Sequence, residues 1–412
     1  MILILLPWLA LASIAAPAKT LLSKEQQFQF SLQKVLSNAQ RPDVAAGMVV
    51  ASPSRQDPDY YFDWVRDTAL TMRSLIDLYE LRHDKKLRAL IVRWVQAEYH
   101  RQNEYALTGL GEPKFNVNGT AFMGPWGRPQ NDGPALRAIA MIKWARLMLA
   151  EGETSYVERL LYKGVLPATT AIKKDLEYTA HHWREPSFDL WEEEQGMHFY
   201  TMLAQYTALV EGAKLARQLH DGPAAAFYEA NAGQIGHFIL TNFTDATVGL
   251  KVTTGKVASL GYKHSGLDVA PLLALLHTWP YQKLIPFTHK QVKVYLGALL
   301  EDARTSHTVN RAYANLGVAI GRYPEDRYDG YHTGKVGNPW FLSTLALGEF
   351  YCLQRGDKAL AEKQFQRVLF HSDNGHMSEQ FNRDTGFMQG AVDLTWSHNA
   401  VLTAMVRCGH VR

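Results

Sequence analysis

Apolar side chains recur at three- and four-residue spacing along nearly the whole chain. Between residues 84 and 100 the spacing is carried by Leu87, Leu90, Ile91 and Trp94, with charged residues between them. This period places the apolar side chains on one face of an α-helix. The same pattern predicts helices at residues 24–38, 68–82, 134–151, 154–176, 198–220, 223–241, 266–278, 290–303, 309–320, 339–355, 357–371 and 393–408. Strand patterns are few, with residues 249–257 as a short candidate. The sequence therefore predicts an all-α fold.

Charge and cysteine content exclude several classes of protein. The 412 residues carry 43 Lys+Arg and 40 Asp+Glu, a net charge of +3, so we expect no nucleic-acid partner. Two cysteines, Cys352 and Cys408, allow at most one disulfide and cannot complete a four-ligand zinc site. The adjacent His181 and His182 point in different directions on a helix. We therefore expect neither a metal nor a cofactor.

The N-terminal residues 1–18 are strongly apolar and end in Ala16-Pro17-Ala18. This pattern predicts a secretion signal, with a buried N-terminal element as the alternative. No other apolar run approaches the length of a membrane span. No linker interrupts residues 19–412, which we expect to form a single domain. The expected location is secreted or periplasmic, with an intracellular protein as the alternative.

Aromatic and charged residues concentrate in segments that run directly into predicted helices. If alternate helices of an antiparallel series run the same way, the loops that precede them gather at one end, where a site would form. These segments are residues 60–67, 114–132, 189–198, 322–340 and 378–396.

Indole and phenol rings beside Arg, Asp and Glu suit a sugar, whose C–H face packs on a ring while its hydroxyls bond to charged groups. Cleavage of a glycosidic bond needs two carboxyl groups, one protonated and one ionised. The candidates are the run Glu192–Glu194 and the distant Glu379. Taken alone, three adjacent glutamates also fit a solvated helix start, and Arg66-Asp67 fits a surface ion pair. The residues thus indicate an all-α protein with a carbohydrate site.

Seven stretches in the same order along the chain together resemble glycoside hydrolase family 15, the glucoamylases. They are residues 51–54 with 58–67, 111–138, 189–193, 321–326, 337–342, 378–386 and 393–397. The resemblance implies an (α/α)6 barrel, two concentric rings of six helices with the active-site loops at one end. It also implies a monomer with no metal or cofactor and no membrane span after signal removal.

The resemblance further implies an inverting, exo-acting glucoamylase that releases β-D-glucose from non-reducing ends of α-1,4-glucans such as starch, glycogen and maltooligosaccharides. Glu192 would be the general acid and Glu379 the general base, with their carboxyl groups roughly 6.5 to 9.5 Å apart. Alternatives are a hydrolase of dextran, isomaltose or trehalose, a catalytically silent glycan-binding barrel, and a helical scaffold for protein partners. The substrate-binding residues carried over by position are Tyr60, Trp64, Arg66, Asp67, Trp126, Asp189, Leu190, Trp191, Glu193, Arg322 and Trp396.

Three positions depart from the pattern of this family. Glu194 stands where an apolar residue is common, and the segment Gly390-Ala391-Val392-Asp393 stands where many fungal members read Ser-Ala-Arg-Asp. In those members the serine that is missing at Gly390 donates to the base carboxylate. A hydrogen bond to an ionised carboxylate lowers its pKa. The missing hydroxyl therefore predicts a higher pKa for Glu379 than in serine-bearing relatives.

Overall fold

The computed structural model, which describes residues 21–354 and 357–411, is built mainly from helices joined by long loops. The predicted signal segment, residues 1–18, lies outside the described residues. The longest strand in the described part has six residues. The prediction of an all-α fold is confirmed, because short strands serve only to tie loops together.

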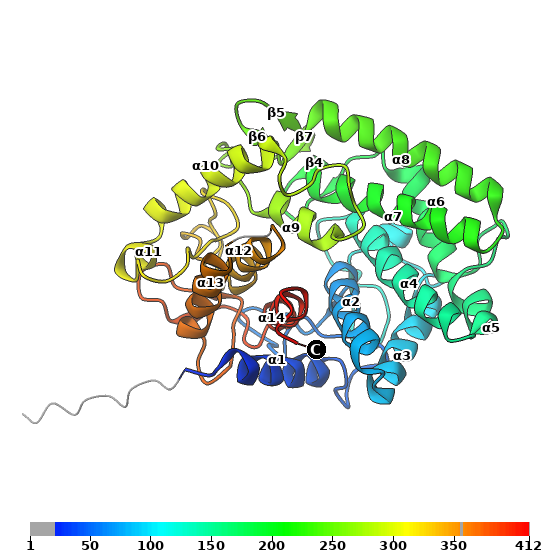
Figure 1. The fold of residues 1–412 in the computed structure, drawn as a ribbon, viewed down its shortest axis with the longest axis horizontal. Helices are drawn as coiled ribbons and strands as arrows, with labels where there is room; N and C mark the ends of the chain where they lie inside the picture. The colour runs from blue at the N-terminus through cyan, green and yellow to red at the C-terminus, as the bar shows by residue number, and fades with distance from the viewer. Residues whose placement is uncertain (1–20, 355–356, 412) are drawn as a thin grey trace, which may run out of the picture.

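A closed inner ring around the centre of the molecule is formed by helices α2 (Val65–Arg82), α4 (Asp132–Ala150), α7 (Phe199–Gln218), α9 (Ala270–Thr278), α12 (Phe341–Leu353) and α14 (Thr395–Arg407) (Figure 1). Each packs against the next one, and the last packs against the first. Most of their faces are buried, since each contacts two ring neighbours and each except α9 packs broadly on an outer helix.

Six further helices alternate with these along the chain and lie outside the ring (Figure 1). Each has one buried stripe and one wet face, as the spacing in α3 predicted. They are α1 (Lys24–Asn38), α3 (Lys85–Arg101), α6 (Ala171–His182), α8 (Gly222–Asn242), α10 (Lys290–Ser306) and α13 (Lys358–His371). Two concentric rings of six helices are the predicted (α/α)6 barrel, which the structure confirms.

Two predicted helices are wrong in extent. The expected helix 154–176 is divided into α5 (Thr154–Tyr156), a π-helical turn Val157–Leu161, and α6, which begins only at Ala171. The interruption contains Gly164 and Pro167, and proline removes a backbone donor that a helix needs.

The second expected helix, 309–320, is reduced to α11 (Thr308–Ala312). Beyond it the chain turns at residues 313–316 and continues without helical structure. There the side chain of Asn310 bonds to the backbone N and O of Ala319, at 2.8 and 3.0 Å. Gly317 also lies so close to Gln364 that a Cβ there would be 2.6 Å from its side chain. Tertiary contacts thus replace helical hydrogen bonds in this segment.

Short strands brace the loops that precede the inner helices. The segment before α2 contributes β1 (Asp63–Trp64), which pairs with β2 (Lys114–Phe115) before α4. Between α6 and α9 a three-stranded sheet joins β3 (Ser187–Phe188), β4 (Gln195–His198) and β7 (Thr253–Ala258). The remaining pairs are β5 (Thr244–Asp245) with β6 (Gly249–Leu250) and β8 (Gln380–Phe381) with β9 (Met388–Gln389). The strand pattern at residues 249–257 is therefore realised in β6 and β7.

The far end of the barrel is tied covalently. Cys352, at the end of α12, forms a disulfide with Cys408, which caps α14. The bridge joins neighbouring inner helices at their C-terminal ends, away from the loops that precede them. Among the described helices, none combines the length and apolar character that a bilayer crossing requires.

Candidate active site

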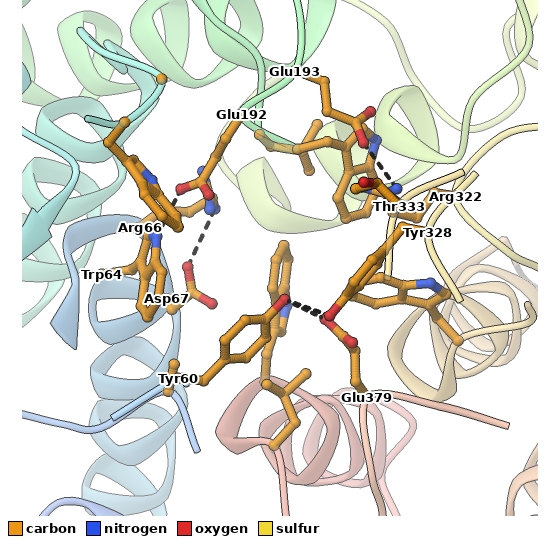
Figure 2. A pocket seen from close by; sticks show the side chains of 18 residues that line it. Tyr60, Trp64, Arg66, Asp67, Glu192, Glu193, Arg322, Tyr328, Thr333 and Glu379 are labelled. Atoms are coloured by element: carbon orange, nitrogen blue, oxygen red, sulfur yellow. Dashed lines mark hydrogen bonds and ion pairs between the residues drawn. The ribbon is translucent and has the colours of Figure 1, made fainter. Parts of the chain in front are cut away.

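A cavity of about 330 Å³ opens at the end of the barrel where the inner helices begin. Its walls come from the segments before α2, α4, α7, α12 and α14, so the five loops singled out in the sequence do meet. Figure 2 shows their side chains converging on one space. The predicted residues that line the cavity are Tyr60, Trp64, Arg66, Asp67, Trp126, Leu190, Trp191, Glu192, Glu193, Arg322, Glu379 and Trp396.

Asp189 is the one predicted binding residue that does not line the cavity. Its side chain is buried behind the loop, where Oδ1 accepts hydrogen bonds from the backbone N of Glu193 at 2.7 Å and of Glu194 at 3.1 Å. Asp189 therefore holds the loop in shape and does not face the space that a substrate would occupy.

Glu192 and Glu379 approach the cavity from opposite sides (Figure 2). Glu192 lies in the loop before α7 with a backbone φ of +67°, a left-handed conformation that L residues rarely adopt. Its Oε1 accepts hydrogen bonds from Trp64 Nε1 at 2.6 Å and Gln130 Nε2 at 3.0 Å. One oxygen is thus held in place while the second remains for a ligand.

Glu379 has a very different environment. It is 1% exposed, and its Oε1 accepts a hydrogen bond from the hydroxyl of Tyr60 at 3.0 Å. The other oxygen, Oε2, is buried without a hydrogen-bond partner among the described residues. Burial raises the pKa of Glu379 to about 8, against the opposing effects of the Tyr60 hydrogen bond and the charge of Arg322.

Beside Glu192 lies a group of buried polar side chains with free hydrogen-bonding capacity. Arg66 donates to Gln130 at 2.9 Å and to Asp132 at 3.2 Å, and its Nε lies 3.3 Å from Asp67 Oδ2. Burial raises the pKa of Asp67 to about 6, against the lowering effect of Arg66. Trp126 Nε1 has no hydrogen-bond partner in the described chain, and Arg66 Nε and Asp67 Oδ2 meet only each other, as an ion pair without a hydrogen bond. Buried polar atoms normally have partners, so the group fits a ligand with several hydroxyls.

Arg322 forms the opposite wall. Its guanidinium is paired with both oxygens of Asp326, at 2.8 and 2.5 Å, and with Oε1 of Glu193 at 2.9 Å. The hydroxyl of Tyr323 donates to Oε2 of Glu193 at 2.6 Å. Glu193 is therefore oriented by two partners, and burial raises its pKa.

Aromatic rings make up much of the remaining surface. Tyr60, Trp64 and Trp126 pack edge to face, with ring centroids 5.7 and 6.0 Å apart. Trp191 packs against Trp396, with 6.4 Å between centroids. Flat apolar walls beside paired charges suit a pyranose ring, which has both C–H faces and hydroxyls.

Several lining residues were not predicted. They are Ala51, Gly127, Tyr328, Thr333, Trp340 and Leu394. Gln130 was also missed, although it lies in a recognised motif, because only the fold turns its amide toward Glu192. A sixth loop, residues 259–269 before α9, was missed as well, since it is poor in aromatic residues. It contributes Lys263 and Asp268, which lie behind the acidic loop, residues 189–194. In the described part of the chain no three His, Cys, Asp or Glu side chains are grouped to hold a metal.

Known proteins resemble this chain in both sequence and structure. The sequence profile of the family described as Glycosyl hydrolases family 15 matches residues 26–356 and 357–406. A probable glucoamylase of Schizosaccharomyces pombe is 35% identical, over 89% of this chain and 85% of its own length. A glucoamylase of Blastobotrys adeninivorans is 33% identical, over 93% of this chain and 70% of its own length. The solved glucoamylase of Saccharomycopsis fibuligera superposes with a TM-score of 0.83 at 28% identity, covering 97% of this chain and 99% of the other.

Proposed function

The chain belongs to glycoside hydrolase family 15, and from this premise we propose that Glu192 and Glu379 divide the hydrolysis of an α-glucan between them as general acid and general base. The protein is a glucoamylase, releasing β-D-glucose from non-reducing ends of α-1,4-glucans. The observation that carries the assignment of roles is the contrast between the two carboxyl groups, which face one cavity from opposite sides (Figure 2).

The environments of the two glutamates match two different tasks. Trp64 and Gln130 hold Oε1 of Glu192, which leaves Oε2 to carry the proton to the departing glycosidic oxygen. Tyr60 holds Oε1 of Glu379, which leaves the unpartnered Oε2 to accept a proton from water. Water attacking the anomeric carbon from the side of Glu379, as the bond on the side of Glu192 breaks, inverts the configuration.

The terminal glucose is proposed to sit between Arg66, Asp67 and Arg322. Arg66 Nε and Asp67 Oδ2 are ion-paired with each other but form no hydrogen bond, so they can bind hydroxyl groups, and their burial restricts the deepest site to a chain end. Glu193, held by Arg322 and Tyr323, would contact the next sugar. Binding at a closed end explains an exo-acting enzyme, because a continuous chain cannot pass through.

The anomeric form of freshly released glucose tests this function. We expect β-glucose from maltotriose, followed by proton NMR before mutarotation equilibrates the product. α-Glucose would contradict the inverting roles of Glu192 and Glu379. Parallel assays with isomaltose and trehalose measure linkage preference. Faster turnover of either sugar than of maltotriose would show that its linkage is the preferred one.

The pH dependence of kcat/KM follows from the buried state of Glu379. A general base must be ionised, and its pKa is raised to about 8 from a usual 4.5. As pH falls through the folded-state pKa, the base takes up a proton and activity declines. We therefore expect the acid limb of kcat/KM to lie well above pH 4.5. An acid limb at or below that value would show that Glu379 is not the titrating base.

Gly390 offers a direct test of the missing donor. It has φ +81°, and a Cβ there would lie 2.8 Å from Oε2 of Glu379 and 3.1 Å from Gly330 Cα. Gly390→Ala and Gly390→Ser thus impose the same crowding, but only serine adds a hydroxyl. We expect kcat to fall in both variants and the acid limb to move to lower pH in Gly390→Ser relative to Gly390→Ala. Coincident limbs in the two variants would rule out the hydroxyl effect.

We also infer that residues 19–412 form one catalytic domain that acts as a monomer in a secreted or periplasmic location. One buried apolar cluster runs from Phe28 to Met405, which supports a single domain. The disulfide Cys352–Cys408 supports an oxidising compartment. N-terminal sequencing of the mature protein tests for cleavage near residue 18. Light scattering measures its oligomeric state. An uncleaved cytosolic protein would contradict the location.

A further inference from the structure

A buried lysine lies directly behind the loop that carries Glu192. Lys263 Nζ is 2.9 Å from Asp268 Oδ2, 3.7 Å from Asp189 Oδ2 and 3.8 Å from Glu194 Oε2. The side chains of Lys263 and of all three carboxylates are at most 5% exposed. Buried carboxylates are costly unless a positive charge is close, so Lys263 is the main charge that keeps this group compatible with burial.

Each carboxylate supports a different part of the acidic loop, residues 189–194. Asp189 accepts hydrogen bonds from the backbone N of Glu193 and Glu194. Asp268 accepts hydrogen bonds from Trp191 Nε1, at 3.0 and 3.1 Å. Glu194 accepts one from the hydroxyl of Ser259 at 2.6 Å. Asp189 therefore binds within the loop that presents Glu192. Asp268 and Glu194 connect that loop to the segment before α9.

The loop needs this outside support because its backbone is unusual. Glu192 is left-handed at φ +67°, and such a conformation persists only where surrounding contacts determine it. The turn is closed by hydrogen bonds from Glu192 N to Asp189 O and from Asp189 N to Glu194 O, both 2.9 Å. The position of the Glu192 carboxyl thus depends on Asp189 and Glu194, which both face Lys263.

We propose that Lys263 is a positioning residue, which acts through Asp189, Asp268 and Glu194 to hold Glu192 where it can protonate the leaving oxygen. The proposal rests on the proposed function, in which Glu192 is the acid. It also explains why a glutamate stands at position 194, where an apolar residue is usual. Glu194 is a buried partner for Lys263 and for Lys256, whose Nζ lies 2.9 Å from Glu194 Oε1. The Lys263 ammonium further lies 4.1 Å over the ring of Tyr323, whose hydroxyl orients Glu193.

The test compares two substrates that differ in their need for an acid. Maltose requires protonation of its leaving oxygen, whereas α-glucosyl fluoride releases a fluoride that needs little help. In Lys263→Met we expect kcat on maltose to fall about 100-fold, within the range of general acid catalysis, and kcat on α-glucosyl fluoride to fall less than tenfold. Lys263→Arg keeps the charge and should retain most of the maltose activity.

Lys173 provides the matched control. It is also a buried lysine, paired with Asp221 at 2.9 Å and Glu177 at 3.2 Å, but it lies on the outer helix α6 away from the cavity. Lys173→Met should lower the melting temperature without changing the ratio of the two activities. Adding Glu194→Gln to Lys263→Met lowers the number of buried negative charges in this group from three to two and should recover at least part of the maltose turnover.

The outcomes separate the positioning role from the proposed function. Equal losses on both substrates in Lys263→Met, or a ratio changed just as much by Lys173→Met, would overturn the role of Lys263. If Lys263→Met does not fold, the same comparison in Lys263→Gln decides. An unaltered protein that turns over neither maltose nor α-glucosyl fluoride would refute the proposed function itself, and the positioning role with it.

Discussion

Replacing Glu379 by Gln is expected to lower kcat on maltooligosaccharides by about 10²- to 10⁴-fold, the contribution typical of a general base. The amide keeps the shape of the side chain and can still bond to Tyr60, but it cannot accept a proton from water. The groups around the terminal sugar, Arg66 and Asp67, are unchanged, so binding of maltose should change little. Steady-state kinetics and calorimetric titration with maltose measure the two quantities. Retained turnover would remove Glu379 from the role of base.

The same variant should be more stable than the unaltered protein at neutral pH. A carboxyl group whose pKa is raised from 4.5 to about 8 on folding favours the folded state below pH 4.5, and this contribution is lost as pH rises toward 8. A buried glutamine does not ionise and avoids that loss. We expect its melting temperature to exceed that of the unaltered protein at pH 8, with the difference shrinking toward pH 4. A difference independent of pH would contradict the buried ionisation of Glu379.

Replacing Glu192 by Gln is expected to produce a loss of about 10²- to 10⁴-fold on maltotriose. The glutamine has no proton to give to the leaving oxygen, so any substrate that needs that proton suffers. Hydrolysis of α-glucosyl fluoride should survive, because Glu379 still activates water. The ratio of the two rates measures how much the acid contributes.

The neighbouring Glu193 provides the control for that experiment. Glu193→Gln keeps the acid and loses part of the ion pair with Arg322, which lies 2.9 Å away. It should therefore raise KM for maltotriose more than it lowers kcat. If Glu193→Gln instead abolishes maltotriose turnover while Glu192→Gln does not, the role of acid belongs to Glu193.

Much of the fold followed from local information. The period of apolar residues located the helices of both rings, because a helix buries a stripe whose spacing is visible in the chain. The same period was misleading at residues 162–170 and 313–320. There, Gly164 and Pro167 break one helix, and contacts from Asn310 to Ala319 hold the other segment in a non-helical form. The second cause could not be predicted, since it depends on how the segment packs.

The cavity was predictable only in part, because only some of its loops have an unusual composition. Loops rich in aromatic and charged residues stood out by composition, but the loop with Lys263 did not, since a lysine and an aspartate are ordinary in any loop. The resemblance implied Asp189 as a binding residue because it belongs to the same loop as Glu192. The structure turns it inward, to the backbone of the acidic loop.

The sequence by itself determined the helical period, the order of the loops and the residue types at each position, because these are properties of neighbours along the chain. Only the tertiary structure decided that Glu192 and Glu379 face one cavity, that burial raises the pKa of Glu379, and that Lys263 lies against three buried carboxylates behind the acidic loop. Burial and electrostatic interactions depend on distance through space, and residues far apart in sequence acquire those distances only when both rings close.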